Sequence, residues 1–345
     1  MSKEITIYDI ASELELSPAT ISRALQDNKN VNKDTKKLIQ NKAEEMGYRH
    51  NSFASNLRKQ KTHTVGVIVH EINSYFITSV LAGIEKVTAE AGYDIIIAHS
   101  GENSVKEIAN AFNLFHKRVD GLIASLSFET TTLNHFHSYI EKKIPIVFFD
   151  RVETLDKTTK VVLDNYEAGY KATRHLIDQG CKKIVMISAS QKRNVYSDRF
   201  KGYKDALCDN NISFKNDWLI INKLSEHAAI ESAYQILKMD PLPDGIFCTS
   251  DFTAAICIRT FKQHGIRVPE DVAFVGFNND AIGKIIEPNL TTINYPGIDM
   301  GEMAARKLMD KLNGVSDRLS TDSFIIPSEL IIRQSSIKKR SKNSL

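Results

Sequence analysis

Side chains of the kind that carry catalysis or hold metals occur in this sequence, but not at the spacings that such sites need. The nearest approach to a metal-binding pair is His135-Phe136-His137, which lies away from any cluster of carboxylates, so we expect it at the surface. No aspartates or glutamates are paired for general acid–base work, and the phosphate-loop, dinucleotide, zinc-protease and α/β-hydrolase motifs do not occur. We therefore expect no enzyme, no cofactor and no metal site.

Length, composition and charge narrow the class of protein further. The chain has 345 residues, of which 42% are hydrophobic, and a formal net charge of +3. This length suggests two or three domains. No apolar run approaches the roughly 18 residues of a membrane span, and the N-terminus lacks the apolar centre of a signal peptide. The four cysteines lie far apart without a CxxC pair, which favours reduced thiols and a cytoplasmic location. They are Cys181, Cys208, Cys248 and Cys257.

The first fifty residues predict three short helices. One starts at Thr6, and Ser17 is a preferred N-cap for a second helix over Pro18–Leu25. The third runs from Asn32 to Met46 and ends at Gly47. The tight turn between the first two helices predicts a helix-turn-helix, whose second helix would enter the major groove of DNA.

A basic segment accompanies these helices. Between Asn28 and Lys61, nine Lys and Arg residues stand against three acidic ones. Such local charge attracts DNA phosphates. A small helical bundle that binds protein or caps the rest of the chain is the alternative, and the basic segment favours DNA.

After Thr64, short apolar runs alternate with amphipathic helical stretches. This pattern indicates an α/β fold with doubly wound parallel sheets. We expect strands at Val65–Val69, Asp94–Ala98, Gly121–Ser125, Ile146–Asp150, Lys183–Ile187, Gly245–Thr249 and Ala273–Phe277.

The number of these units suggests two lobes, with a ligand site between them at the carboxyl ends of the strands. We expect an N-lobe of about 62–162 plus 291–323, including a segment at Leu290–Ile293 and a helix at Gly301–Leu312. The C-lobe would be about 163–290 plus 324–333, with a last strand at Phe324–Ile326. The basic end of the chain, from about residue 334 to 345, is expected to fray.

The sequence resembles the lactose/galactose/purine repressor (LacI-type) family of bacterial transcription regulators. The resemblance covers nearly the whole chain, and the stretch TIYDIASELELSPATISRAL is its most specific part. Later segments that carry it are IPIVFFDR, HLIDQGCKKIVMIS, SDRFKGY, GIFCTSD, VAFVGFNND and PNLTTI. It implies a helix-turn-helix domain over 1–50, a hinge over 51–61, and a two-lobed core similar to periplasmic binding proteins. The core alone would also fit a periplasmic sugar receptor.

The resemblance implies that the start of the second helix reads the major groove. The matching positions are Ser17, Pro18, Ala19, Thr20, Ser22 and Arg23. Pro18 and Ala19 offer only apolar contacts, for example to thymine methyl groups, so polar reading would depend on Thr20, Ser22 and Arg23. For Thr20 the alternative is a contact to phosphate. Positions that match backbone-contacting residues of the family are Thr6, Tyr8, Asn32, Thr35 and Tyr48.

The segment Asn51–Lys59 resembles the hinge helix of the family, which inserts into the minor groove. By this resemblance Asn51 caps the helix, Leu57 wedges between base pairs, Ala54 allows two hinges to approach, and Arg58 follows the groove. Nine residues are fewer than the roughly 12–15 that a marginally stable isolated helix needs. We therefore expect it to form only on operator DNA beside its symmetry mate, the alternative being an ordinary linker. The family usually has proline before the hinge asparagine, whereas this chain has His50.

The resemblance also implies an effector site in the core. The matching positions are His70, Asn73, Tyr75, Phe76, Asp150, Arg151, Arg199, Trp218, Ser250, Asp251, Phe277, Asn278 and Tyr295. Carboxylates, amides and guanidinium groups can bond hydroxyls, while aromatic rings offer flat apolar faces to a sugar. A sugar-like effector is favoured, and a nucleobase remains open.

Together these features predict a ligand-responsive transcription regulator, expected to be a repressor that binds a pseudo-palindromic operator as a homodimer. It would have no membrane partner and would lie in the cytoplasm on the nucleoid. The alternative is a sugar-binding module with only non-specific affinity for DNA.

Overall fold

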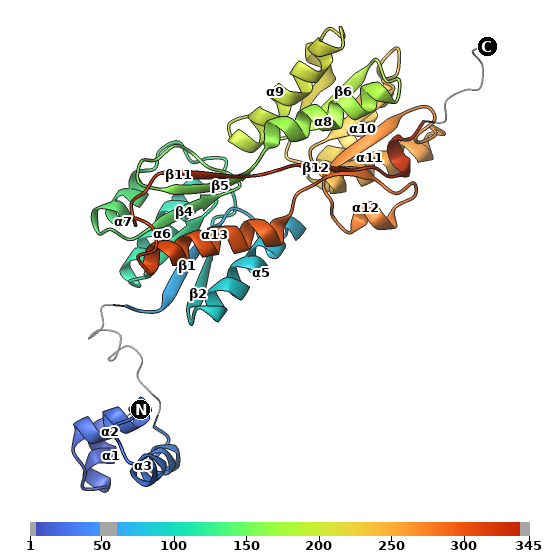
Figure 1. Ribbon diagram of the computed structural model, residues 1–345. Helices are drawn as coiled ribbons and strands as arrows, with labels where there is room; N and C mark the ends of the chain where they lie inside the picture. The colour runs from blue at the N-terminus through green and yellow to red at the C-terminus, as the bar shows by residue number, and fades with distance from the viewer. Residues whose placement is uncertain (1–4, 49–60, 339–345) are drawn as a thin grey trace. The chain divides into compact units, whose positions relative to one another are not determined.

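The computed structural model describes residues 5–48 and 61–338, and it divides the chain into two compact units over 1–62 and 63–345. Figure 1 shows the helices and strands of both units. Each unit has its own hydrophobic core. No helix in the described ranges is long and apolar enough to span a bilayer.

The first unit consists of three helices, α1 (Ile7–Glu13), α2 (Pro18–Leu25) and α3 (Lys33–Glu45). Their starts follow from local chemistry. The Asp9 carboxylate accepts the backbone N–H of Thr6 at 2.8 Å, and the Ser17 hydroxyl accepts the N–H of Thr20 at 3.2 Å. Small and branched apolar side chains fill the space between the helices, and they are Ile10, Ala11, Ile21, Ala24, Ile39 and Ala43.

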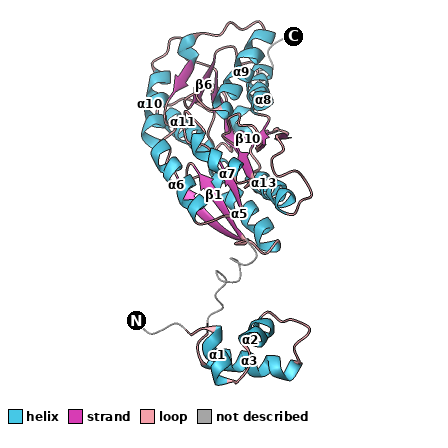
Figure 2. Cartoon of the chain, turned by 90° about the vertical axis from the view of Figure 1, so that its left-hand side faces the viewer, coloured by secondary structure: helices cyan, strands magenta, loops and turns pink. Residues whose placement is uncertain are grey.

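The second unit contains two six-stranded sheets with helices on both faces of each (Figure 2). The first sheet has the order β11-β5-β4-β3-β1-β2, and all its strands are parallel. Its strands are β1 (Thr64–Val69), β2 (Asp94–His99), β3 (Gly121–Ala124), β4 (Ile146–Phe149), β5 (Thr159–Leu163) and β11 (Asp322–Ile326). We call this sheet with its helices the first lobe.

Two helix layers cover the first sheet. On one face α5 (Tyr75–Glu90) and α13 (Gly297–Leu312) lie side by side (Figure 1). On the other face α6 (Ser104–His116) and α7 (His137–Glu141) pack, the latter preceded by a short turn of helix at Asn134–Phe136. The α13 helix therefore belongs to the first lobe, although it follows most of the second in sequence.

The second sheet has the order β12-β10-β9-β8-β6-β7, and only its edge strand β12 is antiparallel to its neighbour. Its strands are β6 (Ile184–Ser188), β7 (Leu219–Ile221), β8 (Gly245–Cys248), β9 (Ala273–Asn278), β10 (Thr291–Asn294) and β12 (Glu329–Ile331). Its helices are α8 (Asn165–Asp178), α9 (Asn194–Asp209), α10 (Glu226–Leu237), α11 (Asp251–Gln263) and α12 (Ile282–Ile285). The helices α8 and α9 pack together, as do α10 and α11, and we call this assembly the second lobe.

Two strands lie in the lobe opposite to the one expected. The segment at Leu290–Ile293 was expected in the N-lobe, but β10 pairs with β9 in the second sheet. The segment Phe324–Ile326 was expected in the C-lobe, but β11 pairs with β5 in the first sheet. In both cases the chain completes the sheet it is leaving before it crosses over. A short apolar run does not specify its sheet, because partners far away in the sequence decide that.

The part of the C-terminal tail that the structure describes does not fray as expected. Ser335 and Ser336 are fully buried, and the Ser335 hydroxyl donates to the carbonyl of Phe274 at 2.8 Å. Lys338 donates to the carbonyl of Asp244 at 2.9 Å. Residues 334–338 are therefore attached to the second lobe.

His135 and Phe136 are buried, contrary to the surface location that we expected. The Nε2 atom of His135 lies 3.0 Å from an oxygen of Glu107, which also accepts from the backbone N–H of Ser127 and the hydroxyl of Thr130. The carboxylate that pairs with this histidine lies 28 residues earlier in the chain, which sequence spacing does not reveal. Within the described ranges, no group of three or more His, Cys, Asp or Glu side chains is arranged to hold a metal ion.

Candidate functional site

The start of α2 presents exposed and half-buried side chains. Ser17 and Ala19 are exposed, Pro18 and Thr20 are half-buried, and Arg23 is exposed on the last turn of the helix. The opposite side of α2 is buried by Ile21 and Ala24. The helix thus directs one short row of side chains outward, as a recognition helix requires.

Three of the polar side chains in this row form hydrogen bonds within the unit. The hydroxyls of Ser17 and Thr20 lie 2.8 Å apart and share a hydrogen bond, while Ser17 also caps the helix. Ser22 is half-buried and lies 3.5 Å from the side-chain nitrogen of Gln26. Arg23 is an exposed donor in the last turn of the helix, and a guanidinium group can bond guanine through two N–H groups.

Charged side chains surround these helices. Lys36 pairs with Asp27 at 2.7 Å, which lowers the pKa of that exposed carboxyl, and Lys42 pairs with Glu45 at 3.2 Å. Lys29, Lys33 and Lys37 are exposed.

The proposed backbone-contacting residues are found at several helix starts. Thr6 and Asn32 flank the starts of α1 and α3, and Tyr8 is 65% exposed. Thr35 is half-buried on α3, and Tyr48 is half-buried against the small core. The proposed hinge residues Asn51, Ala54, Leu57 and Arg58, together with His50, lie outside the described residues.

In the second unit, polar residues follow the carboxyl ends of the strands of both sheets. His70, Ser125 and Asp150 follow β1, β3 and β4 of the first sheet, while Asn278 ends β9 and Tyr295 follows β10 of the second. The two edges face each other, because the Tyr295 hydroxyl donates to the carboxylate of Asp150. The Arg193 guanidinium likewise donates to the carbonyl of Thr130 in the other lobe. We call this region of contact the lobe junction.

Aromatic rings and a buried cation form the centre of the lobe junction. Tyr295 stacks on Phe76 with ring centroids 4.0 Å apart, and it meets Phe277 edge-on at 5.6 Å. The guanidinium of Arg199, on α9, lies 3.5 Å from the centroid of the Phe277 ring. Burial lowers the pKa of Arg199, and burial raises the pKa of Asp150 even though Arg151 and Arg199 favour its ionised form. The three rings, the carboxyl group and the guanidinium group offer both flat apolar faces and hydrogen-bonding groups.

A close helix crossing fixes the position of Arg199. A Cβ atom on Gly169 of α8 would lie 2.2 Å from the backbone oxygen of Arg199, and one on Gly202 of α9 would lie 2.1 Å from that of Tyr166. Only glycine permits this approach of two helix backbones. The Arg199 Nε atom then donates to the Asn165 side chain at 2.8 Å.

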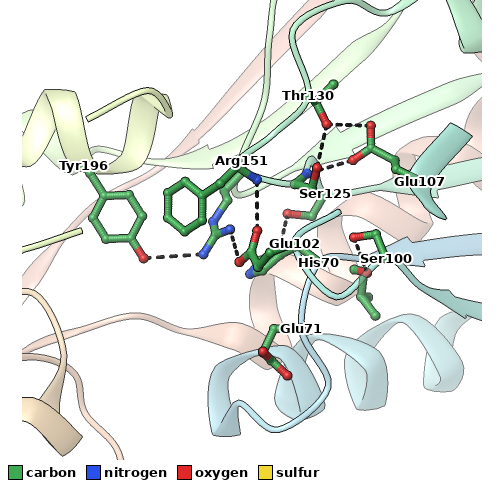
Figure 3. A network of polar contacts seen from close by, with 12 residues as sticks. His70, Glu71, Ser100, Glu102, Glu107, Ser125, Thr130, Arg151 and Tyr196 are labelled. Atoms are coloured by element: carbon green, nitrogen blue, oxygen red, sulfur yellow. Dashed lines mark hydrogen bonds and ion pairs between the residues drawn. The ribbon is translucent and has the colours of Figure 1, made fainter. Parts of the chain in front are cut away.

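Arg151 lies beside this centre but has other partners (Figure 3). It pairs with Glu102 at 2.5 Å, lies 4.1 Å from the centroid of the Phe128 ring, and reaches the Tyr196 hydroxyl of the other lobe at 3.5 Å. Its guanidinium thereby links two loops of the first lobe to α9. His70, also in Figure 3, lies 2.9 Å from the Ser125 hydroxyl. Burial and then the charge of Arg151 lower the pKa of His70 well below its ordinary value, so the ring is neutral at pH 7.

Three predicted effector residues make contacts outside the aromatic centre. Trp218 precedes β7 and lies in the core beside the beginning of β6, away from the carboxyl ends of the strands. Asp251 is fully buried, and its carboxylate accepts the N–H of Asp280 and the hydroxyl of Thr292, both at 2.7 Å. Ser250 caps α11 through the N–H of Thr253. The family resemblance suggested these residues as pocket positions but did not indicate which partners their side chains contact.

The remaining predicted residues lie at the rim of the first lobe. Asn73 and Tyr75 are exposed beside the start of α5, whereas Phe76 is buried against Tyr295. The exposed side chains of Asn73 and Tyr75 therefore lie outside the aromatic centre, although both residues closely precede Phe76 in the sequence.

Several junction residues were not predicted from the sequence. They are Glu102, Phe128, Asn165, Arg193, Asn194, Tyr196 and Leu224. Most stand in loops a few residues beyond a strand, and that position was the one available signal. Leu224 and Phe128 pack against the cluster formed by Ala189, Val195 and Tyr196.

Comparisons with known proteins match both units. Residues 6–51 match a family described as "Bacterial regulatory proteins, lacI family", and residues 173–336 match a "Periplasmic binding protein-like domain". Catabolite control protein A of Priestia megaterium is 31% identical over 334 residues, which cover 96% of this chain and 99% of the relative.

Solved structures are similar as well, among them the following two. The lac repressor dimer bound to operator and the anti-inducer ONPF has a TM-score of 0.84 at 20% identity, over 97% of this chain and all of that one. A periplasmic binding protein/LacI transcriptional regulator from Alkaliphilus metalliredigens, complexed with D-xylulofuranose, has a TM-score of 0.70 at 28% identity. That match covers 80% of this chain and 100% of the other.

Proposed function

Because the chain belongs to the lacI family of bacterial regulatory proteins and is a DNA-binding transcription regulator, we propose that it represses its targets in response to a sugar-like effector. One observation carries the proposal. An exposed recognition helix of the family's kind accompanies a core whose two lobes meet through opposed aromatic rings, carboxylate and guanidinium groups. The sugar bound by the Alkaliphilus relative supports the effector class. Its place in the cell would be the cytoplasm, on nucleoid DNA.

The domain assignment follows from the same features. We assign residues 1–50 to DNA binding, 51–61 to the hinge and 62–333 to the effector-binding core. The effector favours one arrangement of the lobes, and it alters DNA affinity only by its difference in affinity for the two arrangements. The hinge, too short to be a stable helix alone, would transmit that difference by ordering only on operator DNA.

The active form would be a homodimer, for which two apolar surfaces are suited. One is a hollow of about 650 Å³ beside α11 and α12, lined among others by Phe252, Ile256, Ile282 and Ile286. The other is formed by Val105, Ile108 and Phe112 on α6 and by Ile97 on β2, all exposed. Exposed apolar patches of this kind mark protein–protein contacts, and the lac repressor relative is a dimer on its operator.

The operator proposal is tested by selection of a palindromic site from random DNA, followed by gel shifts against a scrambled sequence over a range of salt. We expect the selected site to bind on the order of a thousandfold more tightly than the scrambled one. Equal affinity for both DNAs would instead support a sugar-binding module with only non-specific DNA affinity.

The effector proposal is tested by thermal shift of the full chain with D-ribose, D-xylulose, cellobiose and hypoxanthine. A sugar that raises the unfolding temperature should lose its effect in the Asp150→Asn variant, because that carboxylate lies at the centre of the lobe junction. A shift by hypoxanthine alone would replace the sugar with a nucleobase. Recovery of the sugar unchanged after incubation would accord with a non-catalytic role.

A further inference from the structure

The Asn194 side chain joins the two lobes by bonding to backbone groups of the first lobe. Asn194 is the first residue of α9 in the second lobe, and its amide group contacts the turn after β4 in the first. The Asn194 Nδ2 atom donates to the carbonyl of Asp150 at 3.1 Å, and its Oδ1 atom accepts the N–H of Val152 at 3.0 Å. One side chain therefore uses its donor and its acceptor on two backbone groups of a three-residue turn.

Within that turn, Asp150 has an unfavourable backbone conformation. Asp150 has φ of 59°, in the left-handed region that residues with a Cβ atom rarely adopt. Such a conformation persists where surrounding contacts determine it. On the first-lobe side, the Asp150 N–H donates to the carbonyl of Val161 and the Leu126 N–H donates to the carbonyl of Arg151, both at 3.0 Å. On the second-lobe side, the Asn194 amide contacts the turn.

The conformation decides where the Asp150 carboxylate lies. With the turn held in this way, the buried carboxylate meets the hydroxyl of Tyr295 and shares the centre of the junction with Arg199. Asn194 does not need to contact a ligand to affect this arrangement. Its two hydrogen bonds exist only while the lobes are together, because its helix belongs to the second lobe.

We infer that Asn194 is a positioning residue, which places the Asp150 carboxylate for effector binding when the lobes close. The inference rests on the proposed effector site, and it adds a specific link between lobe closure and the geometry of that site.

The test uses the full chain without effector or DNA, in a double-mutant cycle between Asn194 and Tyr295. Unfolding in urea is followed by the fluorescence of Trp218, the only tryptophan of the chain. Tyr295→Phe removes the hydroxyl that meets Asp150 and should lower the urea midpoint. In Asn194→Ala and Asn194→Asp backgrounds, that loss should fall to less than about half, because Asp150 is no longer placed to receive the hydroxyl.

A second measurement separates the two hydrogen bonds of Asn194. Hydrogen exchange of the Val152 amide should become about tenfold faster in Asn194→Ala, since its acceptor is gone. It should stay slow in Asn194→Asp, which keeps an oxygen for Val152 but presents no donor to Asp150. The aspartate variant thus keeps the hydrogen bond to Val152 but loses the one to Asp150, which is the bond proposed to position the Asp150 carboxylate.

Asn289→Ala is the matched control. Asn289 also donates its side-chain amide to two backbone carbonyls, those of Lys284 at 3.0 Å and Ile286 at 2.9 Å, away from the junction. In this background Tyr295→Phe should cost as much as in the wild type. Additive losses in the Asn194 backgrounds would overturn the inference and leave Asn194 a merely structural residue. Because no effector is added, a failed sugar screen would count against the proposed function and not against this result.

Discussion

At the scale of single residues, neighbours rather than residue type decide what a side chain does. Asp150 and Asp251 both follow strands of parallel sheets, and both are buried. The Asp150 carboxylate accepts a hydrogen bond from a hydroxyl of the other lobe, whereas the Asp251 carboxylate accepts hydrogen bonds from Asp280 and Thr292 within its own lobe. The first therefore links the two lobes, and the second holds the loop after β9.

We expect Arg23→Ala to relax base preference at one position of each half-site. A two-pronged arginine contact to guanine contributes about 1–3 kcal/mol of discrimination. Site selection from randomised DNA measures the change. The control Lys29→Ala, an exposed cation suited to phosphate, should weaken all sequences equally. An unaltered base preference in Arg23→Ala would show that this arginine does not read a base.

A second residue-scale prediction concerns pH. Burial raises the pKa of Asp251 to about 7 and that of Asp280 to about 6, from an ordinary value of 3.8. A carboxyl with a higher pKa in the folded chain binds its proton more readily when folded. Its stabilising contribution is therefore present at low pH and is lost as the pH rises through about 7. We expect Asp251→Asn to reduce this loss of unfolding free energy, as measured by urea unfolding at several pH values.

The matched control for that experiment is Asp178→Asn, at a surface carboxylate that pairs with Arg174 at 2.9 Å. This variant should retain the wild-type dependence on pH. The same slope in Asp251→Asn and wild type would contradict the assigned role of the buried carboxyl.

At the scale of elements, close helix pairs position the functional groups. The crossing of α8 and α9 at Gly169 and Gly202 brings Arg199 into the lobe junction. In the first lobe, α5 and α13 make a similarly close pair, in which a Cβ atom on Gly301 would lie 2.1 Å from the carbonyl of Val80. The small size of these residues therefore determines where the neighbouring side chains lie.

We expect Gly202→Ala to destabilise the core by at least about 1–3 kcal/mol, the usual cost of overpacking. The added methyl group would lie 2.1 Å from the backbone oxygen of Tyr166, which cannot move without displacing α8. Thermal unfolding measures the effect. Cys208→Ala, at an exposed position on the same helix, should change stability by less than about 0.5 kcal/mol. Equal stability of the two variants would show that the helices separate at little cost.

At the scale of the whole molecule, two sheets brought together by several chain crossings create the site. The chain leaves the first lobe after β5, returns after β10, and leaves again after β11. Such multiple connections permit the lobes to reorient without coming apart. A regulator of this family can couple a small change in the arrangement of the lobes to DNA binding.

The dimer proposal gives a prediction at this scale. Phe252→Glu places a charge in the hollow beside α11 and should convert a wild-type dimer into monomers in sedimentation velocity. Operator affinity should then fall on the order of a hundredfold, because two linked recognition helices bind far better than one. The control Val315→Glu alters an exposed apolar residue outside the hollow and should remain dimeric. A dimeric Phe252→Glu protein would place the interface elsewhere.

The sequence by itself determined the local structure of this protein. Caps such as Ser17-Pro18 and the stop at Gly47 define the small helices, because capping depends on adjacent residues. The apolar runs predicted most strands of the core to within two residues. Strands β5, β7 and β12 were missed, because β5 alternates buried with half-buried residues and β7 and β12 have only three residues each.

Only the tertiary structure decided which distant segments meet. The lobes that β10 and β11 join, the core position of Trp218, and the contacts of Asn194 all depend on partners far along the chain. The physical reason is that periodicity and capping act over a few residues. Sheet partners and lobe contacts are instead selected by the packing of surfaces that the chain brings together only when it folds.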